Sequence, residues 1–191
     1  MEDYKIKNEK AQSSLLMFGI FSVVMLFAGF TSAYIVSKGS LGSSWQDIIL
    51  PTSFYVSTIL ILSSSISAIL LIEYCKKDNI LMLNRLLLCT ILLGFSFGIS
   101  QFFGWRELVN QGNYLSGNNV SSSYIYVLTI THLLHVIGGL LVLLFVYFRS
   151  VSNVYNASNF HGLKLAMRFW HFLGFLWIYL FLFINFCRWY L

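Results

Sequence analysis

Residues 123–148 read SYIYVLTITHLLHVIGGLLVLLFVYF and contain no Asp, Glu, Lys or Arg. A helix of that length measures about 39 Å at ~1.5 Å per residue, which is enough to cross the ~30 Å hydrocarbon core of a bilayer. Apolar residues run continuously through the stretch and do not alternate with polar ones, as they would in a barrel strand with a wet interior. The stretch therefore predicts a transmembrane helix.

Four more apolar runs follow the same pattern, and they occupy residues 14–36, 52–73, 84–105 and 167–189. The second run opens after Pro51, whose missing N–H suits the start of a helix. Hydrophobic residues make up 58% of the 191-residue chain and charged residues only 10%, so a soluble core of this size could not bury the apolar surface. We predict an all-α integral membrane protein, in which residues 1–191 form a single bundle of five transmembrane helices.

Basic residues are distributed unevenly between the two ends of these runs. Nine of the twelve fall in the N-terminal tail and around the second-to-third and fourth-to-fifth connections, at Lys5, Lys7, Lys10, Lys76, Lys77, Arg85, Arg149, Lys164 and Arg168. The other three are Lys38, Arg106 and Arg188. Because short cytoplasmic loops carry the excess of positive charge, the N-terminus is predicted in the cytoplasm and the C-terminus on the outer face. The charged segment MEDYKIKNEK does not have the form of a signal peptide, so we expect the first helix to stay in the mature protein.

The charged residues argue against two classes of function. The net charge of +5 comes from scattered Lys and Arg residues that form no dense patch, so no nucleic-acid partner is expected. All seven acidic residues lie in tails, in loops or at the ends of the apolar runs. A pump or proton-coupled carrier that works alone normally needs an internal group that changes charge. The chain is therefore not expected to move ions by itself.

Polar residues gather on one face of the fourth predicted helix. At ~100° per residue, His132, His135 and Gly139 share this face, with Thr129 one turn away. One interpretation is a metal or heme site, as in a histidine-ligated b-type heme membrane anchor. The other is polar contact between helices, beside a glycine that admits close approach. A transmembrane heme needs two ligands at similar depth. His135 lies ~20 Å from the inner end of its helix, whereas His171 lies only ~6 Å from the inner end of the fifth helix. This difference in depth favours the interpretation as a contact between helices.

Arg168, Trp170 and His171 are predicted to lie together at the cytoplasmic boundary of the fifth helix. An aromatic belt at the bilayer interface accounts for Trp170. The sharper hypothesis is that Arg168, with His171 nearby, holds the head group of a phospholipid. His161, in the loop sequence NFHGLK, is expected to be solvated.

Gln101 and Trp105 stand one turn apart near the outer end of the third predicted helix. Hydrogen bonding between helices, together with anchoring at the interface, is the role expected of them. The sequence contains no Gly-rich phosphate loop and no nucleophile elbow. No catalytic, cofactor-binding or metal-binding residue is therefore predicted in this chain.

Three of these stretches together resemble subunit III of the heme-copper respiratory oxidases. The fourth helix resembles that family's T-x-x-H-x-x-H-V-x-x-G pattern, here at Thr129, His132, His135, Val136 and Gly139. The fifth resembles its W-H-F-x-x-x-x-W segment, here at Trp170, His171, Phe172 and Trp177. The third resembles its glutamine followed four residues later by an aromatic residue, here at Gln101 and Trp105. The order and spacing of the three matches agree with the family over residues 14–189.

The resemblance implies the short, five-helix form of cytochrome c oxidase subunit III, with a cytoplasmic N-terminus and a periplasmic C-terminus in the inner (plasma) membrane of a bacterium. It implies a structural subunit of a proton-translocating complex that reduces oxygen to water, with heme and copper in the partner catalytic subunit and none in this chain. Subunit I is the foremost partner, subunit II belongs to the same complex, and bound phospholipid is expected. Subunit III of a quinol oxidase, or an accessory subunit of a nitric oxide reductase, remains an alternative.

Three positions depart from the family pattern. Val23 stands where many relatives have a glutamate, Gly104 where some have another glutamate, and Gly174 where they have an aspartate. Any role of those acids is therefore not expected in this chain.

Overall fold

The computed structural model describes residues 2–116, 119–152, 155 and 160–190. Five long helices account for most of them, with one short 3₁₀ turn: α1 (Glu2–Leu41), η1 (Gly42–Ser44), α2 (Thr52–Lys76), α3 (Ile80–Asn110), α4 (Val120–Val151) and α5 (His161–Tyr190). Each long helix contains a stretch that is long and apolar enough to cross a membrane. No strand occurs in these described ranges. The predicted all-α architecture is confirmed, with five helices that are long and apolar enough to span a membrane.

All five predicted spans lie inside the observed helices, but the helices are longer. α1 begins at Glu2 and not near residue 14, and α5 begins at His161 and not at residue 167. The apolar run marks only the part of a helix that suits hydrocarbon, whereas backbone hydrogen bonding continues into the polar end turns. The expectation of a solvated loop at His161 is wrong. This residue starts α5, is half-buried, and its Nδ1 lies 3.8 Å from Glu9 Oε2.

Local sequence sets several of the helix ends. Pro51 immediately precedes α2, as its missing N–H predicts. The side chain of Asn79 accepts a hydrogen bond from Met82 N (3.1 Å) and caps α3, and the side chain of Asn119 accepts one from Ser121 N (3.0 Å) and caps α4. Residues 77–79 are enough to join α2 to α3, so these two helices form an antiparallel hairpin.

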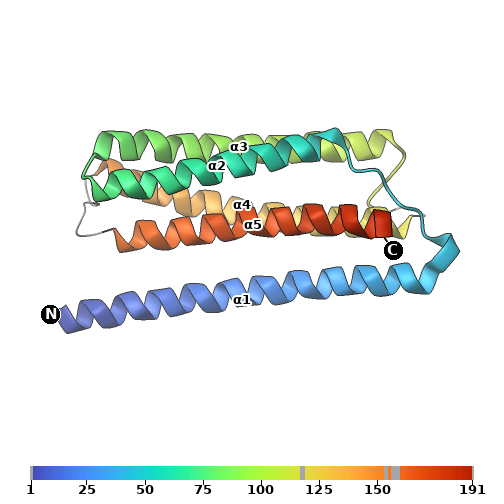
Figure 1. The fold of residues 1–191 in the computed structure, drawn as a ribbon, viewed down its shortest axis with the longest axis horizontal. Coiled ribbons are helices and arrows are strands. Elements are labelled where there is room, and N and C mark those ends of the chain that lie inside the picture. The colour runs from blue at the N-terminus through green and yellow to red at the C-terminus, as the bar shows by residue number, and fades with distance from the viewer. Residues whose placement is uncertain (1, 117–118, 153–154, 156–159, 191) are drawn as a thin grey trace.

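The helices α2, α3, α4 and α5 pack as a four-helix group, and α1 lies against α4 and α5 (Figure 1). The start of α1, the end of α2, the start of α3, the end of α4 and the start of α5 share one end of the bundle. We call this the basic end, because it collects the nine Lys and Arg residues from Lys5 to Arg168 that were assigned to one side. The C-terminus and the α1–α2 and α3–α4 connections lie at the opposite end.

α1 touches the rest of the bundle through one narrow stripe. Most of its covered positions alternate in steps of four and three, at residues 9, 13, 16, 20, 23, 27, 30, 34 and 37, and the neighbouring positions Thr31 and Lys38 are buried as well. This is the 3.5-residue period of a coiled-coil seam. The other sides of α1 expose large apolar side chains such as Leu15, Phe18 and Met25, so they suit contact with lipid or with another protein in the membrane.

Gly94 of α3 provides a test of how closely the four-helix group packs. A Cβ at this position would lie 2.7 Å from Leu140 Cδ2 and 2.7 Å from Trp170 Cη2. We expect Gly94→Ala to destabilise the protein by about 2 kcal/mol, because tightly packed cores resist added methyl groups. Gly98, one turn later, is the matched control, since a Cβ there would lie 3.7 Å from its nearest neighbour, Leu133. Thermal unfolding in detergent measures both variants, and equal losses would contradict the close packing at Gly94.

Candidate functional site

His132 of α4 is completely buried and is surrounded by aromatic rings from three other helices. Its ring centroid lies 6.3 Å from that of Phe27 on α1, 5.9 Å from that of Phe97 on α3 and 5.3 Å from that of Trp177 on α5. The two phenylalanine rings meet it edge to face. His132 is therefore the point at which four helices of the bundle meet.

The two histidines do not form the polar contacts between helices that the sequence suggested. His132 has no hydrogen-bond partner in the described part of the chain. His135 is half-buried, and its Nδ1 lies 2.7 Å from the carbonyl oxygen of Thr131 on its own helix. A carbonyl one turn earlier lies within reach of the ring and competes with any partner on another helix. Both histidines make ring contacts with Phe27 of α1.

A heme ligated by His132 does not fit this arrangement. A porphyrin needs open space beside the coordinating ring nitrogen, but three aromatic rings enclose His132. Within the described ranges, no group of three or more His, Cys, Asp or Glu side chains could hold a metal ion. The alternative of a histidine-ligated heme anchor therefore lacks a site at the buried histidine.

Gln101 and Trp105 make hydrogen bonds between helices. Gln101 is fully buried, and its Nε2 donates to Ser57 Oγ on α2 (2.9 Å). The half-buried Trp105 donates from Nε1 to Thr129 Oγ1 on α4 (3.0 Å). Sequence reasoning missed Ser57, although the polar positions Ser57, Ser64 and Ser67 recur along α2 at helical spacing and are all buried.

Trp170 is part of the core, and its assignment to an interfacial aromatic belt is wrong. The side chain is 1% exposed, and its Nε1 donates to Ser64 Oγ on α2 (2.6 Å). The reason is that α5 begins nine residues earlier, so Trp170 lies about 14 Å inside the helix. Gly139 makes room for it, because a Cβ there would lie 2.7 Å from Leu173 Cδ1 and 3.3 Å from the Trp170 ring.

The structure places Arg149, and not Arg168, beside an apolar groove at the basic end. Arg168 is exposed and His171 is half-buried. The groove has a volume of about 390 Å³ and lies between α1, α4, α5 and the α4–α5 connection. The residues that line it include Leu16, Val142, Phe145, Arg149, Tyr155 and Phe169. The Arg149 guanidinium carbon lies 5.7 Å from the Phe145 ring centre and 5.9 Å from that of Tyr155. In the sequence Arg149 is one more basic residue at the end of an apolar run, so nothing there marked it.

Tyr155 contributes a neutral hydroxyl to this groove. The residue lies in the α4–α5 connection, is 5% exposed, and reaches the start of α5 near Gly162. Burial raises the pKa of the Tyr155 phenol, although the nearby Arg149 opposes the shift. The groove therefore combines an apolar wall with one cation and one neutral donor.

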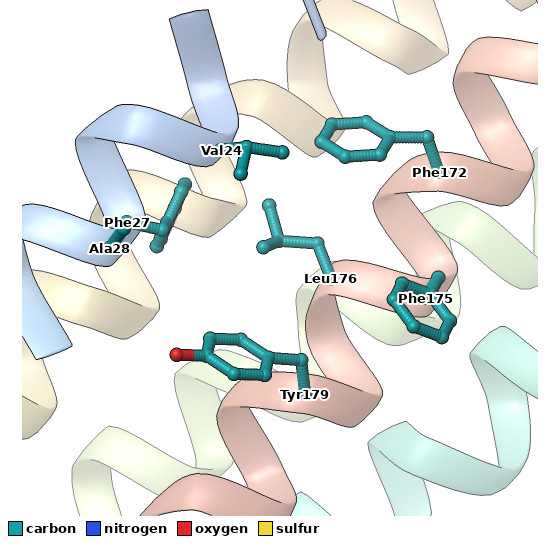
Figure 2. Close-up of a pocket in the computed structure, with 7 residues that line it drawn as sticks. All are labelled: Val24, Phe27, Ala28, Phe172, Phe175, Leu176 and Tyr179. Atoms are coloured by element: carbon teal, nitrogen blue, oxygen red, sulfur yellow. The ribbon is translucent and has the colours of Figure 1, made fainter. Parts of the chain in front are cut away.

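A second groove lies between α1 and α5. Its volume is about 280 Å³, and its lining is apolar: Val24, Phe27, Ala28, Phe172, Phe175, Leu176 and Tyr179. Figure 2 shows Phe172, Leu176 and Tyr179 pointing from α5 toward α1. The Tyr179 hydroxyl lies 3.1 Å from Thr31 Oγ1 and closes one end. This groove can accommodate a hydrocarbon chain and offers no charged group.

Comparison with known proteins identifies the family. The family model described as cytochrome c oxidase subunit III matches residues 7–190. The chain belongs to the cytochrome c oxidase subunit III family. The resemblance drawn from its third, fourth and fifth helices is confirmed.

Individual relatives agree with this assignment. A probable cytochrome c oxidase subunit 3 from Nocardia farcinica is 28% identical over 171 residues, which cover 87% of this chain and 83% of the relative. A cytochrome c oxidase subunit 3 from Bacillus sp. (strain PS3) is 28% identical over 162 residues, with 82% and 76% covered. A cytochrome bo(3) ubiquinol oxidase subunit 3 from Buchnera aphidicola subsp. Baizongia pistaciae is 31% identical over 186 residues, with 95% of each chain covered.

In this member of the subunit III family, two of the three positions named above as departures from the family pattern lie close to neighbouring side chains. A Cβ at Gly104 would lie 2.6 Å from the Phe54 ring, and one at Gly174 would lie 3.1 Å from Ser65 Oγ. Val23 is half-covered and packs against the core. Neighbouring side chains occupy the space beside Gly104 and Gly174, so an acid could not be restored there without moving them.

Proposed function

We propose that this chain is the accessory subunit III of a proton-translocating heme-copper terminal oxidase, in which it acts as a structural and lipid-binding subunit. The observation that carries the proposal is the family match over residues 7–190. The aromatic enclosure of His132 supports a chain without a redox centre of its own. Subunit I, which would hold heme and copper, is the foremost partner, and subunit II belongs to the same complex.

The proposed setting is the inner membrane of a bacterium, with the basic end in the cytoplasm. The nine-to-three distribution of Lys and Arg supports this orientation, because positive charge accumulates in short cytoplasmic loops. The exposed apolar sides of α1 then face lipid or a neighbouring subunit. The C-terminus lies on the periplasmic side.

Cytochrome c and ubiquinol are the two candidate electron donors of the proposed oxidase. Cytochrome c is the donor implied by the names of the Nocardia and Bacillus relatives. Ubiquinol is the second candidate, and the Buchnera relative favours it through its higher identity and its coverage of both chains nearly from end to end. Both donors are compatible with the geometry of this chain, because electrons would enter through other subunits.

Purification of the complex through a tag on this chain tests the proposal. We expect heme- and copper-containing subunits to co-purify and oxygen uptake to follow addition of one donor, reduced cytochrome c or ubiquinol. The separated chain should carry no Soret absorption. A Soret band that stays with the isolated chain, or purification without any heme-containing partner, would refute the assignment.

The lipid-binding part of the proposal rests on the groove beside Arg149. A cation and a neutral hydroxyl at the end of an apolar groove match a phospholipid, whose phosphate is anionic and whose chains are apolar. We expect Arg149→Gln to reduce the phospholipid that co-purifies with the complex by about one molecule per chain. Arg168→Gln is the matched control, since Arg168 is exposed and lines none of the described grooves. Lipid analysis by mass spectrometry measures both, and loss of lipid only with Arg168→Gln would favour the site first suggested by the sequence.

A further inference from the structure

Three buried polar atoms at the centre of the bundle have no hydrogen-bond partner in the part of the chain that the structure describes. They are the two ring nitrogens of His132 and Oε1 of Gln101, and both side chains are 0% exposed. A buried polar group that lacks a hydrogen-bond partner lowers the stability of the folded state. Such groups in a native protein normally call for a partner, and ordered water is a common one.

The neighbours of the two side chains place them in the same layer of the bundle. Phe97, one turn before Gln101 on α3, contacts the His132 ring. Trp105, one turn after Gln101, donates to Thr129, which precedes His132 by one turn on α4. Positions 97, 101 and 105 share one helix face, and α3 and α4 run antiparallel. Gln101 therefore lies between two of the contacts that α3 makes with this part of α4.

Other polar groups of the layer are already used. Ser57 accepts from Gln101 Nε2, which leaves the carbonyl oxygen of the amide without a partner. The hydroxyl of Thr129 accepts from Trp105 and donates to the carbonyl oxygen of Ile125 (2.8 Å). Among the described polar side chains of this layer, Gln101 and His132 keep atoms without a partner, and no direct hydrogen bond joins the two side chains.

We propose that one internal water molecule binds between Gln101 and His132. Its two O–H groups donate to Gln101 Oε1 and to the unprotonated ring nitrogen of His132, and one water spans polar atoms that are about 5 Å apart. The protonated nitrogen of a neutral imidazole is then left for a weak N–H contact with a surrounding ring, and the rings of Phe27 and Phe97 both stand at steep angles to the histidine ring. All three orphan atoms gain a partner.

This site would join the α2–α3 hairpin to α4 and α5 at the middle of the bundle. Gln101 is fixed on the hairpin side by Ser57, and His132 is held on the other side by Trp177, whose Nε1 donates to Thr58 Oγ1 of α2 (3.0 Å). The water closes this ring of contacts without introducing a charge. The water lies in the core of this chain, so its binding depends neither on the electron donor nor on the lipid.

A high-resolution map of the assembled complex, purified through this chain, tests the proposal directly. We expect a water peak within hydrogen-bonding distance of both Gln101 Oε1 and a ring nitrogen of His132. A layer without a peak, or a rotated glutamine bonded directly to the histidine, would overturn it. This measurement uses the unmodified protein, so the test does not depend on whether a variant folds.

Solid-state NMR of the complex, with histidine labelled by ¹⁵N in this chain, gives the second measurement. Magnetisation transferred from water should reach a ring nitrogen of His132, and the signal should be lost in Gln101→Leu. Gln12→Leu is the matched control because Gln12 is exposed on α1, and we expect the signal to persist there. A water signal at His132 that survives Gln101→Leu unchanged would contradict a bridging water.

Discussion

Replacement of Trp170 by alanine is expected to destabilise the protein by about 3–5 kcal/mol, because it opens a large cavity where four helices meet. The ring is 1% exposed, fills the space left by Gly94 and Gly139, and donates its only N–H to Ser64. Transfer from lipid into the core contributes little in a membrane protein, so the loss consists of packing and of one interhelical hydrogen bond.

Trp170→Phe separates these two contributions. The smaller ring keeps part of the packing but cannot donate to Ser64, so we expect a loss of about 1–2 kcal/mol. Phe175 on the same helix is 70% exposed, and Phe175→Ala is the control for loss of an aromatic ring that does not pack in the core. Unfolding of the purified chain in detergent or bicelles measures all three variants. Equal stability of Trp170→Ala and Phe175→Ala would show that Trp170 does not hold the bundle together.

Lys38→Met is expected to cost about 3 kcal/mol and to loosen the attachment of α1. Lys38 is 9% exposed, and its Nζ donates to Asp47 Oδ1 (2.8 Å) and to the carbonyl oxygen of Cys187 (2.6 Å). The ammonium group therefore joins the end of α1 to the α1–α2 connection and to the end of α5. Removal of one partner of a shielded ion pair leaves the other without its counter-charge. Partial exposure of Asp47 keeps the expected cost at the lower end of the range for buried pairs.

Hydrogen exchange along α1 is the most specific measurement for this variant. The contacts of α1 with α4 and α5 run along one stripe only. Loss of the Lys38 hydrogen bonds should therefore increase hydrogen exchange at residues 30–41 more than in α3. Adding Asp47→Asn to Lys38→Met should recover part of the stability, since the neutral amide does not need a counter-charge. Lys76→Met serves as the control because Lys76 is exposed at the end of α2. Unchanged hydrogen exchange in α1 after Lys38→Met would show that Lys38 does not hold the end of α1 in place.

The sequence located the helices but could not tell which side of each helix faces the core. In a soluble helix, apolar residues mark the buried face, whereas both the lipid-facing and the core-facing sides of a membrane helix are apolar. Phe175 and Trp177 illustrate this point: they are two positions apart and similarly apolar, yet one is 70% exposed and the other is 2% exposed. Polar residues within the apolar runs were a better indication of the core-facing side than apolar residues, since Ser57, Ser64 and Gln101 are all 0% exposed.

Residue spacing predicted which side chains of the fourth helix share a face, but it did not predict their contacts. Residue spacing placed Thr129, His132 and Gly139 on one face, and all three are covered by neighbouring helices. Spacing could not show that His135 bonds to its own backbone or that His132 has only aromatic neighbours, because those contacts depend on residues from distant parts of the chain. The same limit explains why the sequence did not mark Arg149, whose groove is lined by residues from distant parts of the chain.

The sequence by itself determined the number of helices, the end of the bundle that collects positive charge, and the family. These properties follow from the length of apolar runs, the placement of Lys and Arg, and a few residues at fixed spacing. Tertiary structure alone decided that Trp170 belongs to the core and that α1 is held by one stripe of contacts and by the hydrogen bonds of Lys38. It also decided that His132, within the segment TITHLLHVIGG, is buried without a hydrogen-bond partner in the described chain. The physical reason is that the partners of these side chains come from other helices, and a bilayer gives each helix no other mark of its inward face.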